Sequence, residues 1–319
     1  MTRYLLRRVP SALLVLVLAS MLVFAVIRLV PGDPVATLAG PDATPEARAT
    51  IRHELGLDQS VVSQYVDWVH QLFSGDLGRS YMIGGDIGDL VRHGLVNTLV
   101  LTTAALVISI VLGLLLSLVT VIADKPWLDN LLAAGNTLAV ALPTFVTGLL
   151  LVLVFAVVLP VLPAGGVPPT GFIARPDIAA QYLMLPALCL ALPTTAALTR
   201  FLTDALQSQL RQPYVLTATA LGIPRRRIVL TQALRNALPS TVTLLGIQVG
   251  VLLGGAVLVE AIFAWPGLGR LIEQAISSRD YPVVQVLLLM SVAVFVVTQL
   301  VSDAVHAWLD PRVRLGGES

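Results

Sequence analysis

The chain of 319 residues is too apolar for a soluble domain: 56% of its residues are hydrophobic, 12% are charged, and the mean hydropathy is +0.86. This composition predicts an integral membrane protein. The formal net charge of +1 gives no reason to expect nucleic acid as a partner. The single cysteine, Cys189, excludes an internal disulfide and a cysteine-built metal site. Lys125 is the only lysine and follows Asp124, so no phosphate-binding P-loop is present and any nucleotide chemistry must belong to a partner.

The N-terminal segment, residues 1–30, is expected to be a retained transmembrane helix. Three arginines precede an unbroken apolar run from Val9 to Ile27. A signal peptide has a similar start, but its apolar region is only about 7–15 residues long and ends in a small-residue cleavage site. Here the run ends instead at Arg28, followed by a segment rich in proline and glycine.

Residues 31–96 are polar and acidic, which predicts a small helical extracytoplasmic domain between helices 1 and 2. One amphipathic helix is expected to open at Thr44-Pro45 and to stop at Gly56. A second is expected after Ser60, with an apolar stripe of Val61, Tyr65, Trp68 and Leu72. The three histidines of this domain, His53, His70 and His93, lack the spacing of a helical metal site, so we expect them to be solvated and expect no metal.

Residues 97–319 are expected to form the transmembrane core. Since about 20 apolar residues cross the hydrocarbon core, five segments are candidate spans: residues 97–123, 128–159, 182–203, 240–263 and 282–305. The segment 182–203 is the weakest, because Pro186 and Pro193 interrupt it. Together with the first helix they make an all-α protein with six spans. Basic residues are denser in residues 1–8, 124–129, 204–239 and 306–319, so the positive-inside rule places both termini in the cytosol.

A basic, interrupted stretch from Gln212 to Pro239 lies in the cytosolic loop 204–239. Pro213 suits the first turn of a helix and Gly222 the position just past its end, so the pattern predicts a short helix from Pro213 to Leu221. By local physics alone this segment could be a hairpin that returns the chain to the membrane, with its arginines near anionic headgroups.

The stretch resembles the cytoplasmic loop of permease subunits of ATP-binding-cassette (ABC) importers, in the dipeptide, oligopeptide and nickel branch. The resemblance rests on Tyr214 to Gly222, on the basic turn that follows, and on Gln232 to Pro239. The chain departs from many members of the wider superfamily at Leu216, where they have a glutamate. Further motifs follow the order of the family along nearly the whole chain: 28–34, 55–59, 75–80, 142–145, 259–269 and 279–282.

The resemblance implies six transmembrane helices of the type I ABC importer permease type, in a bacterial inner membrane. It implies import of peptides delivered by an extracytoplasmic solute-binding protein, with a second homologous permease and two ABC ATPase subunits as partners. No cofactor is expected in this chain, and ATP and Mg would bind the ATPases. The cytosolic helix would be the coupling helix that docks on the ATPase, which assigns docking to Tyr214, Thr217, Ala218, Gly222, Arg225 and Arg226.

Other candidate residues lie in the spans. Gly246, Gly250 and Gly254 recur every four residues, which predicts close helix packing, with a hinge as the alternative. Glu260 is either a functional charge at membrane depth or a structural partner of the Pro266-Gly267 turn. Asp303 and His306, one turn apart, suggest either a proton relay or an interfacial helix end. Polar groups deep in the spans either line the pathway or bond to carbonyls freed by prolines: Thr144, Thr147, Thr194, Thr195, Thr199 and Gln248.

Two rival functions remain weaker. A secondary transporter driven by ions usually shows an internal repeat and a membrane-embedded acid. The sequence shows no internal repeat, and no carboxylate lies in the middle of a span. An intramembrane hydrolase needs serine, histidine and aspartate at one depth, and no such set converges. Nickel or another small solute is the alternative cargo for the same importer machinery.

Overall fold

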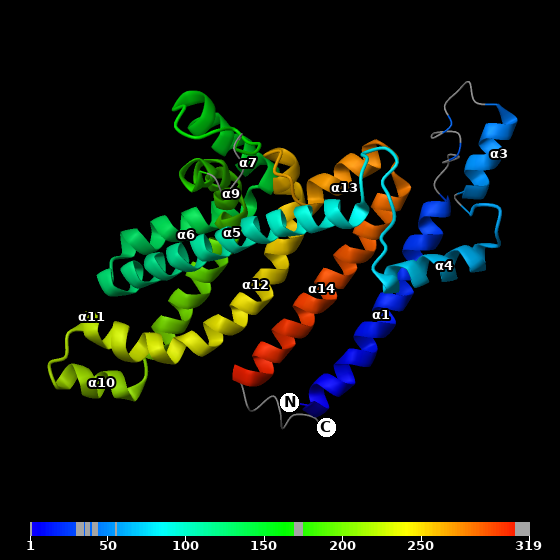
Figure 1. The fold of residues 1–319 in the computed structure, drawn as a ribbon. Helices are drawn as coiled ribbons and strands as arrows, with labels where there is room; N and C mark the ends of the chain where they lie inside the picture. The colour runs from blue at the N-terminus through cyan, green and yellow to red at the C-terminus, as the bar shows by residue number, and fades with distance from the viewer. Residues whose placement is uncertain are drawn as a thin grey trace. The chain divides into compact units, whose positions relative to one another are not determined.

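Nearly all regular structure in the computed structural model is helical. The structure describes residues 2–29, 35, 39, 44–54, 56–168 and 175–309. Within these ranges the β-pairing is limited to an isolated bridge between Arg79 and Asp86. The elements follow one another as drawn in Figure 1, with π-helical stretches marked η: α1 Thr2–Leu29, α3 Pro45–Glu54, α4 Val61–Ser74, α5 Ile87–Ala123, α6 Pro126–Ala141, α7 Thr144–Val152, η1 Leu153–Val158, α9 Pro176–Leu210, α10 Pro213–Ala220, α11 Arg225–Ile228, η2 Val229–Ala233, α12 Leu234–Ile262, α13 Leu268–Ser277 and α14 Tyr281–Leu309.

Two compact units make up the chain. One comprises residues 96–269 and the end of α14 from residue 298; the other comprises residues 2–95 and 270–297. Among the described residues, five helical segments are long and apolar enough to cross a membrane, and six if the bent pair formed by α6 with α7 and η1 is counted as one span. The sequence prediction of an all-α membrane protein with six spans therefore agrees with the fold.

The segment expected to cross as one span, residues 128–159, is not a continuous helix. It breaks at Leu142 and Pro143, and the two halves are bent by 107°. The residue before a proline is driven out of the helical region by the ring, and Leu142 accordingly has φ −76° and ψ 126°. The sequence contains the cause of this break, because Pro143 also lacks the N–H that a continuing helix would use.

Helix α9 lies at the centre of the first unit and runs unbroken through Pro186 and Pro193. It is the most buried of the candidate spans that the described residues contain, and it packs against α6, α7 and α12. Its weak hydropathy is explained by this position, since a helix surrounded by protein need not be apolar all round. One core cluster joins it to α5 and α12 through Leu101, Leu185 and Leu252.

Helices α5 and α9 approach closely through a stripe of small residues on α5. Ser109 Oγ donates to the carbonyl of Ala191 at 3.1 Å, and Ser117 Oγ donates to the carbonyl of Thr199 at 3.0 Å. Between them, a Cβ on Gly113 would lie 3.0 Å from the Cβ of Leu198. Small residues every four positions allow this contact, and sequence reasoning missed the stripe because serine and glycine were mixed within it.

The second unit contains the two predicted amphipathic helices, and both are confirmed. Ser60 caps α4 by accepting from the N–H of Ser63 at 3.2 Å, and Gly75 ends α4 in the left-handed conformation. The half-buried side of α4 packs on α1: the ring of Phe24 lies 5.1 Å from that of Tyr65 and 5.7 Å from that of Trp68. The amphipathic stripe is thus used to dock α4 on the first membrane helix.

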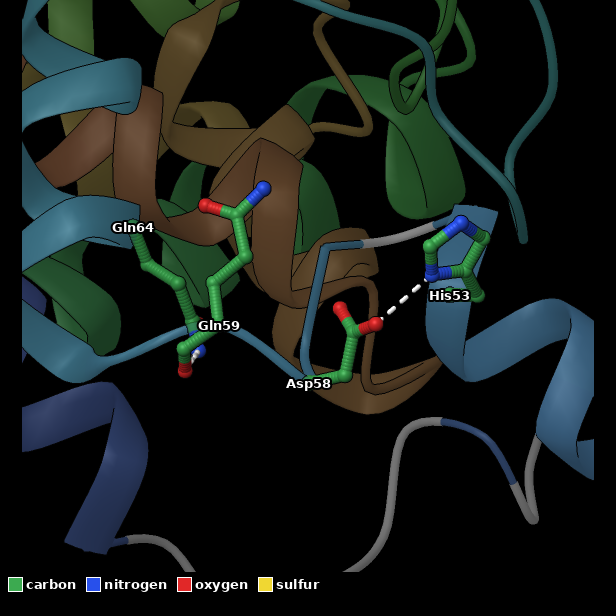
Figure 2. Close-up of polar contacts among 4 residues, drawn as sticks. All are labelled: His53, Asp58, Gln59 and Gln64. Atoms are coloured by element: carbon green, nitrogen blue, oxygen red, sulfur yellow. Dashed lines mark hydrogen bonds and ion pairs between the residues drawn. The ribbon is translucent and has the colours of Figure 1, made fainter.

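A tight turn joins α3 to α4 (Figure 2). His53 Nδ1 and Asp58 Oδ2 lie 2.6 Å apart, and Gln64 Nε2 donates to the backbone carbonyl of Gln59 at 2.8 Å. The hydrogen bond from His53 holds the pKa of Asp58 below its ordinary value. These contacts explain the polar residues of the motif at 55–59. Leu55 of that motif and most of the motif at 28–34 lie outside the described residues.

Candidate functional site

The short helix predicted within residues 204–239 is present as α10, from Pro213 to Ala220. Its end forms a Schellman motif, in which the N–H of Ile223 bonds to the carbonyl of Ala218 at 3.1 Å and the N–H of Gly222 to that of Thr219 at 2.9 Å. Gly222 has φ +78°. The helix ends one residue earlier than expected, with Leu221 as its C-cap.

Changing Gly222 to alanine is expected to loosen this end of α10. A side chain at positive φ costs about 1 kcal/mol, although nothing crowds a Cβ there. Hydrogen exchange of the amides in α10 should therefore be faster in Gly222→Ala than in wild type. Gly222→Asn is the matched control, since asparagine tolerates the left-handed region better; equal protection in all three proteins would contradict the prediction.

The docking assignment of Ala218 needs correction. Its side chain is only 5% exposed and faces the chain itself, where α10 packs beside α11 (Figure 1). Tyr214 is half-buried, and its hydroxyl lies 3.2 Å from Oε1 of Gln209 on α9. The inward side of α10 is therefore built from these two residues, so an ATPase could reach Tyr214 only in part and the Ala218 side chain not at all.

The outward face of α10 is apolar and carries two residues that sequence reasoning did not select. Leu216 is 74% exposed and Leu221 is 75% exposed. Thr217 and Ala220 lie between them on the same exposed side. Large exposed leucines flanked by small residues are typical of a surface that another protein covers. In the sequence, Leu216 stands out only as a departure from the superfamily pattern. Its apolar side chain was the signal that could have identified it as part of a docking surface.

Arg225 and Arg226, both assigned to docking, have different surroundings. Arg225 Nε donates to the backbone carbonyl of Val121 at 3.0 Å, and its Nη2 lies 2.8 Å from Oδ1 of Asp124. Both partners belong to the end of α5 or the turn after it. The Arg225 side chain is nevertheless 44% exposed, and Arg226 and Arg227 are exposed as well. The guanidinium of Arg225 is thus engaged within the chain.

Glu260 is fully buried at the end of α12 and holds a turn together. Its Oε1 accepts from the hydroxyl of Thr98 at 2.6 Å, and its Oε2 accepts from the N–H of Gly269 at 2.6 Å. Thr98 Oγ1 in turn accepts from the N–H of Leu268 at 2.9 Å. The carboxylate therefore joins α5 to the start of α13, which favours the structural interpretation of Glu260.

The turn at Pro266 and Gly267 fits closely over this carboxylate. A Cβ on Gly267 would lie 2.2 Å from the Glu260 carboxyl carbon, so only glycine fits. Asn97 Nδ2 donates to the carbonyl of Pro266 at 2.9 Å, and the indole Nε1 of Trp265 donates to the carbonyl of Asn97 at 3.0 Å. The motif at 259–269 thus specifies one rigid corner.

The glycine stripe of α12 is only partly used within the chain. A Cβ on Gly255 would lie 3.1 Å from Leu190 of α9, whereas nothing in the described chain lies within 4 Å of a Cβ on Gly250 or Gly254. Gly246 is half-buried. The close packing that the structure shows is therefore made by Gly255, and the face with Gly250 and Gly254 stays open.

The polar residues of the spans divide into two groups. Thr194, Thr195 and Thr199 of α9 are buried inside the helix packing, and the Thr199 hydroxyl bonds to the carbonyl of Thr195 at 2.8 Å. These three side chains are therefore enclosed by helix packing in this conformation, and their assignment to the pathway stays a prediction. Thr144, Thr147 and Gln248 keep partly exposed side chains and stay candidates.

Two motifs whose contacting residues are 200 positions apart in the sequence meet in the second unit. Asp280 Oδ2 accepts from the hydroxyl of Ser80 at 2.6 Å and from the N–H groups of Met82 and Ile83 at 3.0 and 3.3 Å. Ser80 Oγ also accepts from the N–H of Gly84 at 2.9 Å. The motifs at 75–80 and 279–282 therefore form one buried clamp on the loop before α5.

Two earlier alternatives concern residues away from these sites. Asp303 and His306 lie within α14, but their side chains are outside the described residues. His53, His70 and His93 belong to no group of three metal-ligating side chains in the part of the chain that the structure describes. His93 Nδ1 instead lies 2.7 Å from the carbonyl of Asp89, within its own helix.

Comparisons with known proteins add to this geometry. Residues 109–315 match the family model described as binding-protein-dependent transport system inner membrane component, and residues 1–86 match the model for the N-terminal part of such membrane components. A protein of Brucella abortus (strain 2308), provisionally named a peptide transport system permease, is 37% identical over 98% of this chain and 99% of its own. The glutathione transport system permease protein GsiC of Escherichia coli (strain K12) is 32% identical over the same shares.

The fold has a solved counterpart. The structure of the MetNI methionine ABC transporter in an inward-facing conformation aligns with a TM-score of 0.51 and 21% identity, covering 69% of this chain and 96% of that one. At this level of identity the match concerns the fold alone. It agrees with the helical membrane fold described above.

Proposed function

We propose that this chain, which belongs to the family of binding-protein-dependent transport system inner membrane components, forms half of the translocation pathway of an ATP-driven peptide importer. The relatives that it matches over 98% of its own length and 99% of theirs are themselves named as permease proteins. The chain would therefore act as a transport subunit, and ATP hydrolysis with bound Mg would take place on partner ATPases.

The outward face of α10 carries this proposal. An eight-residue helix presents Leu216 and Leu221 beyond the surface of the chain, and the fixed turn at Gly222 leads directly into α11 and α12. A rigid apolar knob between two membrane helices is suited to dock in a groove of an ATPase and to transmit its movement. A loop needed only to return the chain to the membrane gains nothing from two exposed leucines.

The other partners follow from the arrangement of the spans. The open face of α12 with Gly250 and Gly254 suits a close contact with a second, similar permease. With both termini in the cytosol, the helices α3 and α4 and the loop clamped by Asp280 lie outside the membrane, where a solute-binding protein would deliver the substrate. The protein would reside in a bacterial inner membrane.

Peptides are the proposed cargo because relatives over the whole chain are named for peptide and glutathione transport. The test is uptake by proteoliposomes that contain the complete complex with its binding protein. Dialanine, tetra-alanine, glutathione and Ni²⁺ serve as labelled probes. Uptake of at least one peptide, competed by the others and not by Ni²⁺, supports the proposal; uptake of Ni²⁺ alone would replace peptides with a metal ion as cargo.

A further inference from the structure

Arg225 is the first residue of α11 and joins the end of the docking helix to another part of the permease. Only four residues separate it from Ala220, the last residue of α10, and three of the four are fixed by the Schellman turn and by Pro224, the N-cap of α11. From Arg225 the helix continues through η2 into α12, up to Ile262. A displacement of α10 must therefore move Arg225.

The guanidinium of Arg225 holds the last turn of α5. Its Nε bonds to the carbonyl of Val121 at 3.0 Å, and its Nη2 pairs with Asp124 at 2.8 Å. Val121 is among the last residues of α5, whose final carbonyls have no partner within the helix and carry the negative end of its dipole. The Arg225 side chain thus donates to one of the last carbonyls of α5 and pairs with Asp124, which follows the helix.

An apolar cluster lies directly behind this polar contact. Val121 packs with Val229 and Ala233 of η2 and with Leu206 of α9. The π-helical geometry of η2 is of a kind that often marks a functional site. The polar contact of Arg225 therefore closes one end of a joint between α5, α9 and the segment that leads into α12.

A polar cavity of about 190 Å³ adjoins the same contact. Charged groups of both signs line it: Asp124 and Asp129 face it together with Arg211 and Arg225. The ion pair is open to solvent, since the Arg225 side chain is 44% exposed and the Asp124 side chain is 65% exposed. The bond from Nε to the Val121 carbonyl, which is part-buried, therefore complements the exposed ion pair.

We propose that Arg225 is a positioning residue that makes α10 and the cytosolic end of α5 move together, in place of the ATPase contact first assigned to it. The proposal rests on the proposed function, since it concerns how movement of the docked ATPase reaches the spans. Because the link reaches α5 directly, a second membrane helix follows α10 in addition to α12. Asp124 and the Val121 carbonyl are its partners on α5.

The test is a spin-label distance between the two elements in the complete reconstituted complex. The labels sit at Gln212→Cys, where the exposed N-cap makes no capping bond through its side chain, and at Val119→Cys on the exposed side of α5. Cys189→Ala removes the native cysteine. Distances are recorded without nucleotide and with ATP and vanadate, alongside the amount of ATPase that co-purifies.

In the otherwise wild-type protein the distance should stay the same in both nucleotide states. In Arg225→Ala it should differ between them, with ATPase retention unchanged and peptide uptake per ATP lowered roughly fivefold or more. Arg225→Lys should recover part of the effect, because one ammonium cannot replace two separate donors. Arg227→Ala, at an exposed arginine with no docking assignment, is the matched control and should behave as wild type.

Two results would overturn the proposal. One is a constant distance in Arg225→Ala, and the other is loss of the ATPase from Arg225→Ala, which would return Arg225 to a docking role. Failure of the proposed function would look different, because then the protein with Arg225 intact would retain no ATPase. Even in that case, a distance distribution without nucleotide that is as narrow in Arg225→Ala as in the parent would refute the link.

Discussion

Replacing Leu216 and Leu221 together with alanine is expected to release the ATPase subunits from the permease while the spans stay folded. Both side chains are about three-quarters exposed in the chain alone, so their truncation leaves no cavity. If both are buried in a groove of the ATPase, their loss costs ~2–4 kcal/mol of binding, or roughly 30- to 1000-fold in affinity. The measurement is the amount of ATPase that co-purifies with the detergent-solubilised permease.

The matched control is Leu149→Ala, which truncates another exposed leucine, on α7 and not on the docking helix. It should retain the ATPase at the level of wild type. If the double variant also retains it, then α10 is not the docking surface and the basic turn becomes the next candidate. If the control loses it as well, the effect belongs to general instability.

Replacing Glu260 with alanine is expected to have the largest effect on stability. The buried carboxylate accepts from the Thr98 hydroxyl and from the N–H of Gly269, and its removal leaves both donors without this partner inside the protein. Each buried donor left unsatisfied costs about 1–3 kcal/mol. The melting temperature of the purified protein in lipid nanodiscs should fall clearly, and Glu260→Gln should fall less because one acceptor oxygen remains.

Gly267→Ala tests the same contact by changing the turn instead of the Glu260 carboxylate. The new methyl group would lie against the Glu260 carboxyl carbon, so the turn must open and the melting temperature must fall. Gly135→Ala on α6 is the matched control, because nothing in the described chain lies within 4 Å of its Cβ and alanine favours a helix. Equal melting temperatures for the two variants would contradict the structural role of Glu260.

Local sequence patterns were sufficient to predict most helices. Pro213 and Gly222 bounded α10 to within one residue, and Ser60 marked the start of α4, since caps and breakers act on their own neighbours. The break at Pro143 was also a local effect, yet it was underweighted against the length of the apolar run. Boundaries set by neighbouring residues are thus accessible from sequence.

The faces of α10 could not be predicted in the same way. In a helix of two turns, Ala218 and Leu216 are equally plausible on the inner side, and the choice depends on what α11 offers as a neighbour. Burial of Ala218 lets α10 approach α11 closely and turns Leu216 outward. The docking face therefore follows from packing between two elements and not from the pattern of one.

Contacts between distant segments were beyond single-sequence reasoning. Arg225 meets Val121 across 104 positions, and Ser80 meets Asp280 across 200. Each of these polar residues looks like an ordinary loop residue in its own segment. Motifs around Ser80 and Asp280 were noticed through the family resemblance, but their partnership required the fold.

ATP-driven peptide uptake with all ion gradients collapsed is the most direct measurement of the central claim. Proteoliposomes with the reconstituted complex, its binding protein and labelled dialanine are treated with ionophores for H⁺, Na⁺ and K⁺. The account predicts that uptake continues with enclosed ATP and stops with a non-hydrolysable analogue. Uptake that needs no ATPase and disappears when the ion gradients collapse would contradict it and identify a secondary transporter instead.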